Sequence, residues 1–159
     1  MSSARYCFAG LPPRISGACF CRSVSYTVTG RPVLSAYCHC TRCQVMNGSA
    51  FIWTIHFPAA AFTWRHPEPH DDALDTYVTD GKPWKTRYRC KRCGCCVGSY
   101  NTKTEQWSVW GVQLDKQEGG ANLDGLKPTA HIFYDTRLVD VNDQLSKWDG
   151  YEGTSTRIL

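Results

Sequence analysis

Cys38-His39-Cys40-Thr41-Arg42-Cys43 is the densest of three cysteine clusters in this chain, and the other two read Cys19-Phe20-Cys21 and Cys90-Lys91-Arg92-Cys93-Gly94. Together the clusters hold seven of the ten cysteines. Zinc binds thiolates in tetrahedral geometry, so four cysteines close a site, whereas three leave one position open for water or substrate. The sequence therefore predicts one structural zinc and one reactive zinc.

The segment 90–94 has the pattern of a zinc knuckle: two thiols three residues apart, followed by a glycine that permits the positive φ of a turn around a metal. A knuckle needs a second pair of ligands. The preferred pair is Cys19 and Cys21, which uses all seven thiols as a group of four and a group of three. The alternative pairs the knuckle with two of the middle cysteines and leaves Cys19 and Cys21 as a weak half-site.

The middle cluster is expected to be extended, so that Cys38 and Cys40 face one metal. His39 then points away from that metal, and we expect it to be hydrogen-bonded near the surface. Three thiolates around a divalent ion carry a net charge of −1 with an open position, which suits the capture of a thiol as thiolate. The prediction is a catalytic site at Cys38, Cys40 and Cys43.

Alternating apolar residues predict strands over 23–29 and 51–57. Further short strands are expected at 61–65, 74–78, 86–89, 96–100, 106–112 and 130–133, and helical turns at 59–62 and 138–148. The pattern is typical of an all-β domain. We expect this domain to span 16–150, between a loose leader at 1–15 and a frayed polar tail at 151–159.

Composition narrows the class of protein. No apolar run is long enough for a secretory signal or a membrane span, so a cytoplasmic protein with metal-bound cysteines is expected rather than a disulfide-linked one. The net charge of +4 is mild. One dense basic patch, at 85–92, is either a solvated strand face or an anion-binding surface. It lacks a nucleic-acid-binding motif, so we do not expect a nucleic-acid partner.

These motifs resemble the glutathione-dependent formaldehyde-activating enzyme family, which includes the centromere protein V relatives. The resemblance extends over roughly 17–150 and rests on the ordered segments Ser16–Cys21, Cys38–Cys43, Gly48–Phe51, Arg89–Gly94 and Lys127–Ile132. It implies a β-tent fold of small antiparallel sheets around zinc. It also implies a structural zinc on Cys19, Cys21, Cys90 and Cys93 and a catalytic zinc on Cys38, Cys40 and Cys43.

The activity implied by the resemblance joins glutathione to formaldehyde to give S-hydroxymethylglutathione, classed in reverse as a carbon–sulfur lyase. Arg42, Arg87 and Arg89 are expected to hold the carboxylates of this small-molecule substrate, because guanidinium pairs with carboxylate bidentately. Gly48 and Ser49 are expected to let backbone amides approach it.

Two alternatives remain at this point. The tryptophans at 53, 84, 107 and 110 either pack in the core or shape a cleft for an aromatic metabolite, which a zinc lyase, dehydratase or hydrolase would process without glutathione. The other alternative is a non-catalytic zinc module whose open site is closed by His39, Cys95 or Cys96 or by a partner. Its function would then be contact between the basic patch and a protein or nucleic-acid surface. Cys95 and Cys96 are otherwise expected to be buried as small hydrophobic residues.

Overall fold

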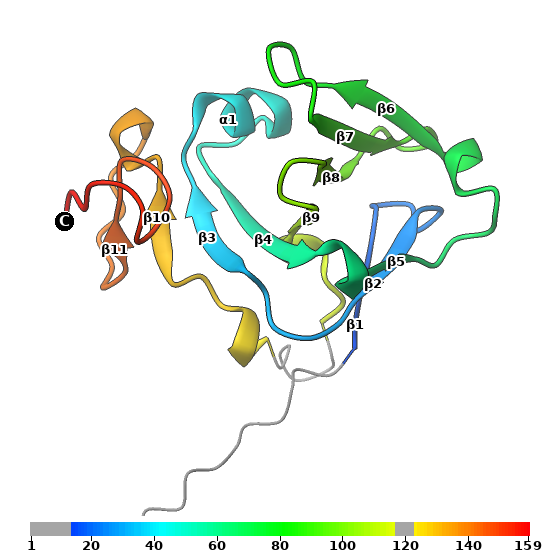
Figure 1. Ribbon diagram of the computed structural model, residues 1–159, viewed down its shortest axis with the longest axis horizontal. Coiled ribbons are helices and arrows are strands. Elements are labelled where there is room, and N and C mark those ends of the chain that lie inside the picture. Colours follow the sequence, from blue (N-terminus) through cyan, green and yellow to red (C-terminus); the bar gives the residue numbers. More distant parts are fainter. Residues whose placement is uncertain (1–13, 117–122) are drawn as a thin grey trace, which may run out of the picture.

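The computed structural model describes residues 14–116 and 123–159, and it divides them into two β-sheets (Figure 1). The smaller sheet has the order β1-β2-β5, and the larger has the order β11-β10-β3-β4-β9-β8-β7-β6. The strands are β1 (Ile15–Ala18), β2 (Ser25–Val28), β3 (Leu34–Cys38), β4 (Ile52–Pro58), β5 (Phe62–Trp64), β6 (Leu74–Val78), β7 (Lys85–Cys90), β8 (Cys96–Asn101), β9 (Gln106–Trp110), β10 (Ala130–Ile132) and β11 (Ser146–Lys147). The described helices are α1 (Thr41–Asn47) and the short 3₁₀ helices η1 (Ala59–Ala61), η2 (His70–Ala73), η3 (Gly111–Gln113), η4 (Asp124–Leu126) and η5 (Tyr134–Thr136).

This architecture confirms the prediction of an all-β fold. The larger sheet is mixed rather than purely antiparallel, because β10 pairs in parallel with both β3 and β11. A parallel partner requires a long connection, and β10 returns to β3 only after the chain has built β4 to β9. The sheet curls from β10 and β3 through β4 to β6 and β7, with α1 at one end of the curl (Figure 1).

The strands predicted from periodicity are all present, with ends shifted by at most two residues. The alternating residues Val24, Tyr26 and Val28 are fully buried, as expected for the inward face of β2. The helical turn expected at 59–62 is η1, but the segment 138–148 contains no helix and instead ends in β11. The sequence pattern had not indicated β3 or α1.

An aromatic cluster fills the core between the two sheets. Phe62 stacks on Trp107 with ring centroids 4.1 Å apart and on Tyr26 at 5.2 Å. A Cβ atom at Gly111 would lie 2.0 Å from the ring of Trp53, so only glycine fits there. Trp53 and Trp107 are therefore core residues, as the packing hypothesis expected.

The C-terminal segment differs from the expected frayed tail. The N–H of Lys147 donates to the Leu159 carbonyl at 3.0 Å, and the Ile158 N–H donates to the Lys147 carbonyl at 2.7 Å. These bonds occupy the outer edge of β11, which would otherwise leave its backbone groups unpaired. The expected leader lies outside the described residues up to position 13, and Ile15 already belongs to β1.

Candidate metal centres and active site

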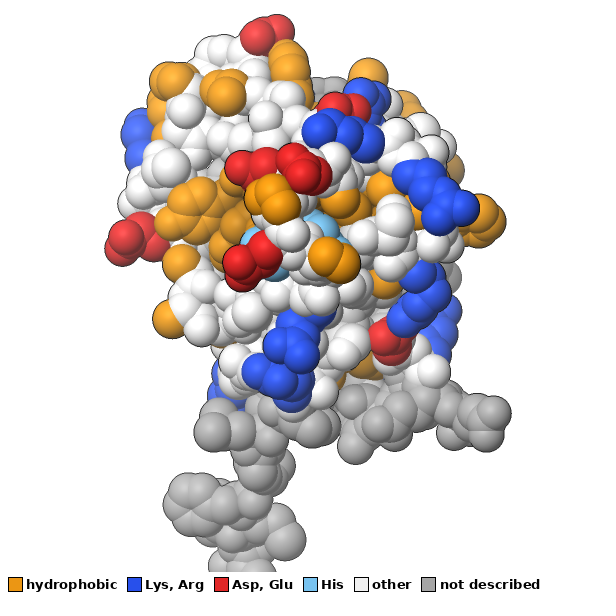
Figure 2. All heavy atoms as spheres, turned by 90° about the vertical axis from the view of Figure 1, so that its right-hand side faces the viewer, with side chains coloured by type: hydrophobic (Ala, Val, Ile, Leu, Met, Phe, Trp, Pro, Cys, Tyr) orange, Lys and Arg blue, Asp and Glu red, His pale blue; other side chains and the backbone are white. Residues whose placement is uncertain are grey.

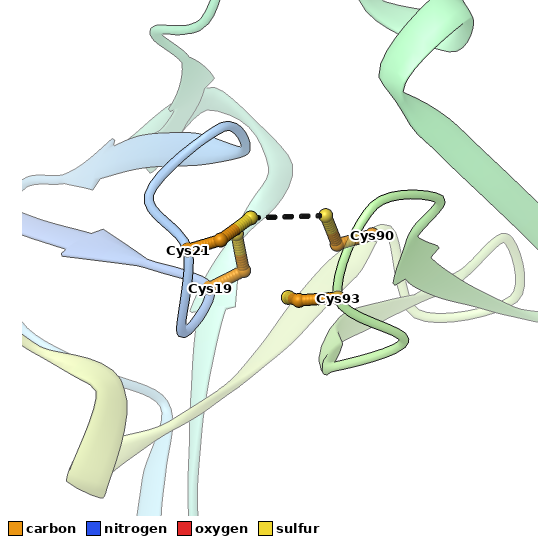
Figure 3. A group of neighbouring side chains, drawn as sticks. All are labelled: Cys19, Cys21, Cys90 and Cys93. Atoms are coloured by element: carbon orange, nitrogen blue, oxygen red, sulfur yellow. Dashed lines mark hydrogen bonds between the residues drawn. The ribbon is translucent and has the colours of Figure 1, made fainter.

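Four cysteines from two distant turns meet between the sheets (Figure 3). Cys19 and Cys21 lie in the turn after β1, and Cys90 and Cys93 lie at the end of β7 and in the turn that follows. Their thiols point toward one another, with the Cys21 Sγ 3.7 Å from the Cys19 Sγ and 3.8 Å from the Cys90 Sγ. The structure therefore brings together the group of four that the sequence favoured.

Both turns need unusual backbone conformations. Gly94 has a φ of +72°, as expected for the knuckle glycine, and its N–H donates to the Cys90 carbonyl at 2.9 Å. In the other turn Arg22 has a φ of +63°, which is uncommon for a residue with a Cβ. The turn is held by the N–H of Val24, which donates to the Cys19 Sγ at 3.3 Å.

A hydroxyl lies among these thiols. The Ser23 Oγ is 3.0 Å from the Cys21 Sγ and 3.2 Å from the Cys90 Sγ. Hydrogen bonding to Ser23 lowers the pKa of Cys21 to about 6, whereas burial raises the pKa of Cys19 to about 11. Ser23 was not predicted as a site residue, and it stabilises negative charge on the group.

Three further cysteines meet where β3 passes into α1. Cys38 ends β3, Cys40 is the N-cap of α1, and Cys43 lies in the first helical turn. The Cys38 and Cys43 sulfurs are 3.7 Å apart, and the Cys43 N–H donates to the Cys40 Sγ at 3.4 Å. The backbone is extended through Cys40, as expected for Cys38 and Cys40, and the helix that follows brings Cys43 to the same place.

The sulfur spacing in both groups fits a metal ion. Tetrahedral zinc with bonds of about 2.3 Å separates its sulfur ligands by about 3.8 Å. The sulfur pairs described above lie 3.7–3.8 Å apart, and within each group all sulfurs lie within 4.8 Å of one another. Each group could hold a metal ion. The alternative partition, with the knuckle bound to the middle cysteines, does not occur in the structure.

The thiols of the smaller group share charge unequally. Hydrogen bonds from Cys38 and Cys43 hold the pKa of Cys40 well below its usual range. Hydrogen bonds to Cys40 and Cys43, together with burial, raise the pKa of Cys38. One thiolate is thus stabilised by the protein itself at the position that caps the helix.

His39 points away from this group, as predicted, but it is completely buried rather than near the surface. Its Nε2 is 2.8 Å from the His131 Nδ1, and the His131 Nε2 is 2.9 Å from Asp143. The ammonium of Lys147 bonds the same carboxylate at 3.0 Å. The burial arises because β10 pairs with β3 and covers His39, which sequence spacing could not reveal.

This buried network holds the segment that carries the thiols. The His39 carbonyl accepts hydrogen bonds from Gln44 Nε2 at 2.7 Å and from Thr136 Oγ1 at 3.0 Å. Burial lowers the pKa of His39 to about 4, so the ring is neutral near pH 7. Asp143 was not predicted as a member of this network. The sequence signal for the network was the histidine in the segment Lys127–Ile132.

A cavity of about 830 Å³ opens over the three-cysteine group. Cys38, Cys40 and Cys43 line it together with apolar side chains from several strands and the C-terminal segment. Its charged lining residues are Arg42, Lys82, Lys85, Arg87, Lys103 and Glu152. Five cations and one carboxylate among the described lining residues give the cavity a positive potential, which favours an anionic ligand.

The predicted substrate contacts divide into two sets. Arg42 and Arg87 line the cavity, but Arg89 is absent from its lining and pairs with Asp75 at 3.4 Å. Gly48 ends α1 with a φ of +57°, and the Ser49 hydroxyl donates to the Phe51 carbonyl at 3.1 Å. Gly48 and Ser49 therefore shape the helix end and do not line the cavity.

Cys95 and Cys96 are half-buried on opposite sides of their strand. Cys95 packs with the four-cysteine group and accepts a hydrogen bond from Gln113 Nε2 at 3.1 Å, while Cys96 packs beside the three-cysteine group. Among the described residues, neither sulfur joins either metal-binding group. Both therefore pack as the small hydrophobic residues that were expected.

The charges in the cavity perturb one another. Burial and the neighbouring guanidinium of Arg87 lower the pKa of Lys85 to about 8. Burial, reinforced by Lys85 and Arg87, lowers the pKa of His56 to about 3. Both shifts follow from placing positive charges together in a partly desolvated space, and a bound anion would relieve them.

Outside the cavity the basic side chains do not form a continuous stripe on the face drawn in Figure 2. There they lie in separate groups, with acidic and hydrophobic side chains between them (Figure 2). A surface of this kind offers no extended track for a phosphate backbone. In the part of the chain that the structure describes, no helix is long and apolar enough to cross a membrane.

The fold and site define a β-protein with two cysteine groups, of which the smaller opens on a cationic cavity. The profile of the family described as glutathione-dependent formaldehyde-activating enzyme matches residues 14–136. The chain belongs to this family, as the motifs predicted.

The structural comparison supports the fold. A crystal structure of a Rhodobacter sphaeroides protein superposes with a TM-score of 0.51 at 16% identity, over 71% of this chain and 97% of that chain. At this identity the likeness concerns the fold alone. A search of curated proteins finds no match to the chain.

Proposed function

We propose that the protein joins glutathione and formaldehyde to S-hydroxymethylglutathione, a reaction classed in reverse as that of a carbon–sulfur lyase. The observation that carries this proposal is the opening of three convergent thiols, and not of the other four, onto a cationic cavity. Family membership supports the choice of thiol and aldehyde. A cytoplasmic location stays a prediction.

Zinc is the metal proposed for both groups. Cys19, Cys21, Cys90 and Cys93 would hold a closed structural ion. Cys38, Cys40 and Cys43 would hold an ion with one open position, which supplies Lewis acidity and lowers the pKa of a thiol bound there. The sulfur distances fit both assignments.

The side chains of the cavity supply binding and orientation. Glutathione carries two carboxylates and one ammonium group, so its net charge is negative, as the lining favours. Arg87 and Arg42 are proposed to bind the carboxylates, because guanidinium offers two parallel donors to a carboxylate. The Arg87 Nε is buried and has no hydrogen-bond acceptor within the described structure, so its N–H is available to donate to a carboxylate of the ligand.

The test is exchange spectroscopy by nuclear magnetic resonance with ¹³C-formaldehyde and glutathione. The zinc-loaded protein should increase the exchange rate between free aldehyde and adduct in proportion to enzyme concentration. Cys43→Ser removes one thiol of the smaller group, and Cys95→Ser is the matched control outside both groups. An exchange rate that is independent of wild-type enzyme concentration would exclude the proposed reaction.

A second candidate function has its own observation. Trp84, Trp110, Phe133 and Tyr151 line the same cavity, which would suit a flat aromatic anion. A zinc lyase, dehydratase or hydrolase acting on such a metabolite would work without glutathione. Turnover of an aromatic carboxylate at an unchanged rate when glutathione is omitted would favour this candidate.

The non-catalytic alternative requires that a fourth ligand from this chain or from a partner close the smaller group. Among the described residues no histidine, carboxylate or further cysteine joins it, and His39 faces a different network. This geometry argues for an exchangeable position, which an enzyme uses and a closed module does not.

A further inference from the structure

Lys85 and Arg87 present two cations side by side in the cavity. They alternate along β7 with Thr86 between them, so both side chains leave the strand on one face. Both line the cavity that contains the sulfurs of Cys38, Cys40 and Cys43. The Lys85 amine and the proposed thiol-binding position therefore open on the same cavity.

The Lys85 amine has no acceptor to hold its proton. Its Nζ makes no hydrogen bond or ion pair within residues 14–116 and 123–159, and its strand neighbour across the ladder is the uncharged Asn101. Glu152 is the acidic side chain among the described lining residues, and it is already bonded to the Thr129 hydroxyl at 2.6 Å. The other charged groups of the lining are the cations Arg42, Arg87, Lys82 and Lys103 and the thiols of the three-cysteine group, of which Cys43 and Cys38 partly offset the lowering of the Lys85 pKa.

This environment favours the neutral amine, which is the nucleophilic form. A lysine that is desolvated or placed beside another cation is activated in this way for attack on carbonyl compounds. Burial and Arg87 lower the pKa of Lys85 to about 8, so much more of Lys85 than of an ordinary lysine is neutral at pH 7.4. An ordinary lysine with a pKa of about 10.4 is neutral to about one part in a thousand at that pH.

We propose that Lys85 captures the small aldehyde substrate covalently and passes its carbon to the thiol. This inference rests on the proposed function, since that function supplies the aldehyde. The amine lone pair attacks the carbonyl carbon, and the carbonyl oxygen gains a proton to give a carbinolamine. The carbinolamine hydroxyl takes up the proton that the thiol gives up on becoming a thiolate and leaves as water, which gives an iminium ion on Lys85.

The transfer step completes the balance without any oxidant or reductant. The thiolate sulfur attacks the iminium carbon and forms the carbon–sulfur bond of an N,S-acetal. Water then replaces the amine at that carbon, the carbon–nitrogen bond breaks, and Lys85 departs with a proton. The sum is addition of a thiol to an aldehyde, and Lys85 is regenerated.

The other two lysines of the cavity serve as matched controls. Lys103 lies with its ammonium 3.3 Å from the centre of the Trp84 ring, an arrangement that stabilises its charged form. Lys82 is exposed at the rim. Both lysines meet the same local concentration of aldehyde as Lys85. A difference in labelling rate therefore reflects the nucleophilicity of the amine rather than its position in the cavity.

The test is reductive trapping of the wild-type, zinc-loaded protein with ¹³C-formaldehyde below one equivalent and cyanoborohydride at pH 7.4. Cyanoborohydride delivers hydride to the iminium carbon and leaves a stable labelled methyl group. Peptide mass spectrometry should find Lys85 labelled about tenfold faster than Lys82, Lys103 or the surface residue Lys91. Labelling of Lys85 at or below the rate of these lysines would overturn the proposal.

A variant separates capture from simple carboxylate binding. Lys85→Arg keeps the positive charge but cannot form the iminium, so the exchange rate at saturation should fall at least tenfold while the KM for glutathione stays within about twofold. An unchanged saturating rate would overturn the transfer step. Trapping needs no glutathione, so it tests aldehyde capture separately from condensation. If Lys85 is labelled but the protein has no condensation activity, the proposed function is refuted and capture of the aldehyde by Lys85 is supported.

Discussion

The two cysteine groups should differ in what they contribute to stability, because they join segments at different distances along the chain. The contact between Cys21 and Cys90 joins residues 69 apart, whereas Cys38 and Cys43 are 5 apart. A cross-link stabilises mainly by restricting the unfolded chain, and more so for longer loops. The larger group also connects the β1–β2 turn to the β7–β8 turn, which belong to different sheets.

Matched double substitutions isolate this difference. Cys90→Ser with Cys93→Ser removes one half of the larger group, and Cys40→Ser with Cys43→Ser removes two ligands of the smaller one. Each pair contains one buried and one half-buried thiol, and serine remains a good N-cap at position 40. The loop-closure relation gives about 4.4 kcal/mol for the 69-residue loop and about 2.1 kcal/mol for the 5-residue loop.

The difference of about 2.3 kcal/mol corresponds to roughly 5–9 °C in melting temperature for a domain of this size. Differential scanning calorimetry of the zinc-loaded proteins, with metal content measured in parallel, provides the assay. We expect each variant to lose one zinc per chain, with the larger drop in melting temperature for the 90/93 pair. Equal drops, or a larger drop for the 40/43 pair, would refute the division into structural and reactive groups.

Three further predictions concern the cavity and the buried network. Arg87→Met should raise the KM for glutathione by roughly 10- to 150-fold, because it removes a charge-assisted hydrogen bond of about 1.5–3 kcal/mol. Arg89→Met, at a residue outside the cavity lining, should leave this KM unchanged. Steady-state kinetics measures both. Asp143→Asn should lower the free energy of unfolding by about 3 kcal/mol by leaving the buried ammonium of Lys147 unpaired, and adding Lys147→Met should restore most of it in urea titrations. Because the pKa of His56 is lowered to about 3, the unfolded state binds more protons than the folded state between about pH 6.5 and 3. The free energy of unfolding therefore decreases as the pH is lowered through that window. His56→Gln should flatten this slope in urea titrations at several pH values.

The partition of the cysteines was predictable because it depends on residue type and count. Cys38 and Cys40 share one face of the extended segment that was expected, and Cys43 follows in the first turn of α1, so the three thiols converge. The helix itself gave little signal. It is seven residues long, its N-cap is a cysteine rather than Ser, Thr, Asp or Asn, and its first turn has no acidic residue.

The surroundings of the site were less predictable because they depend on contacts between distant segments. His39 is buried by a partner strand 92 residues away, which no local pattern indicates. Arg87 and Arg89 are two residues apart on β7, so strand alternation predicts the same face for both. Only Arg87 lines the cavity, whereas Arg89 pairs with the carboxylate of Asp75 on β6. Strand alternation thus predicts the face of a side chain but not its partner.

The distribution of cations gives an independent reason to regard the smaller cysteine group as the reactive one. The four-thiolate group carries the greater negative charge when metal is bound, yet it is stabilised by local donors, Ser23 and the Val24 N–H, and none of its members lines the cavity. The three-thiolate group carries less charge but opens on five cations. These cations outnumber the negative charge of the metal group, and they lie close enough together to lower the pKa of Lys85. Their mutual repulsion destabilises the folded protein unless an anionic ligand is bound. The excess therefore supports the proposal that an anionic substrate binds beside the smaller group, and this support does not depend on the number of metal ligands.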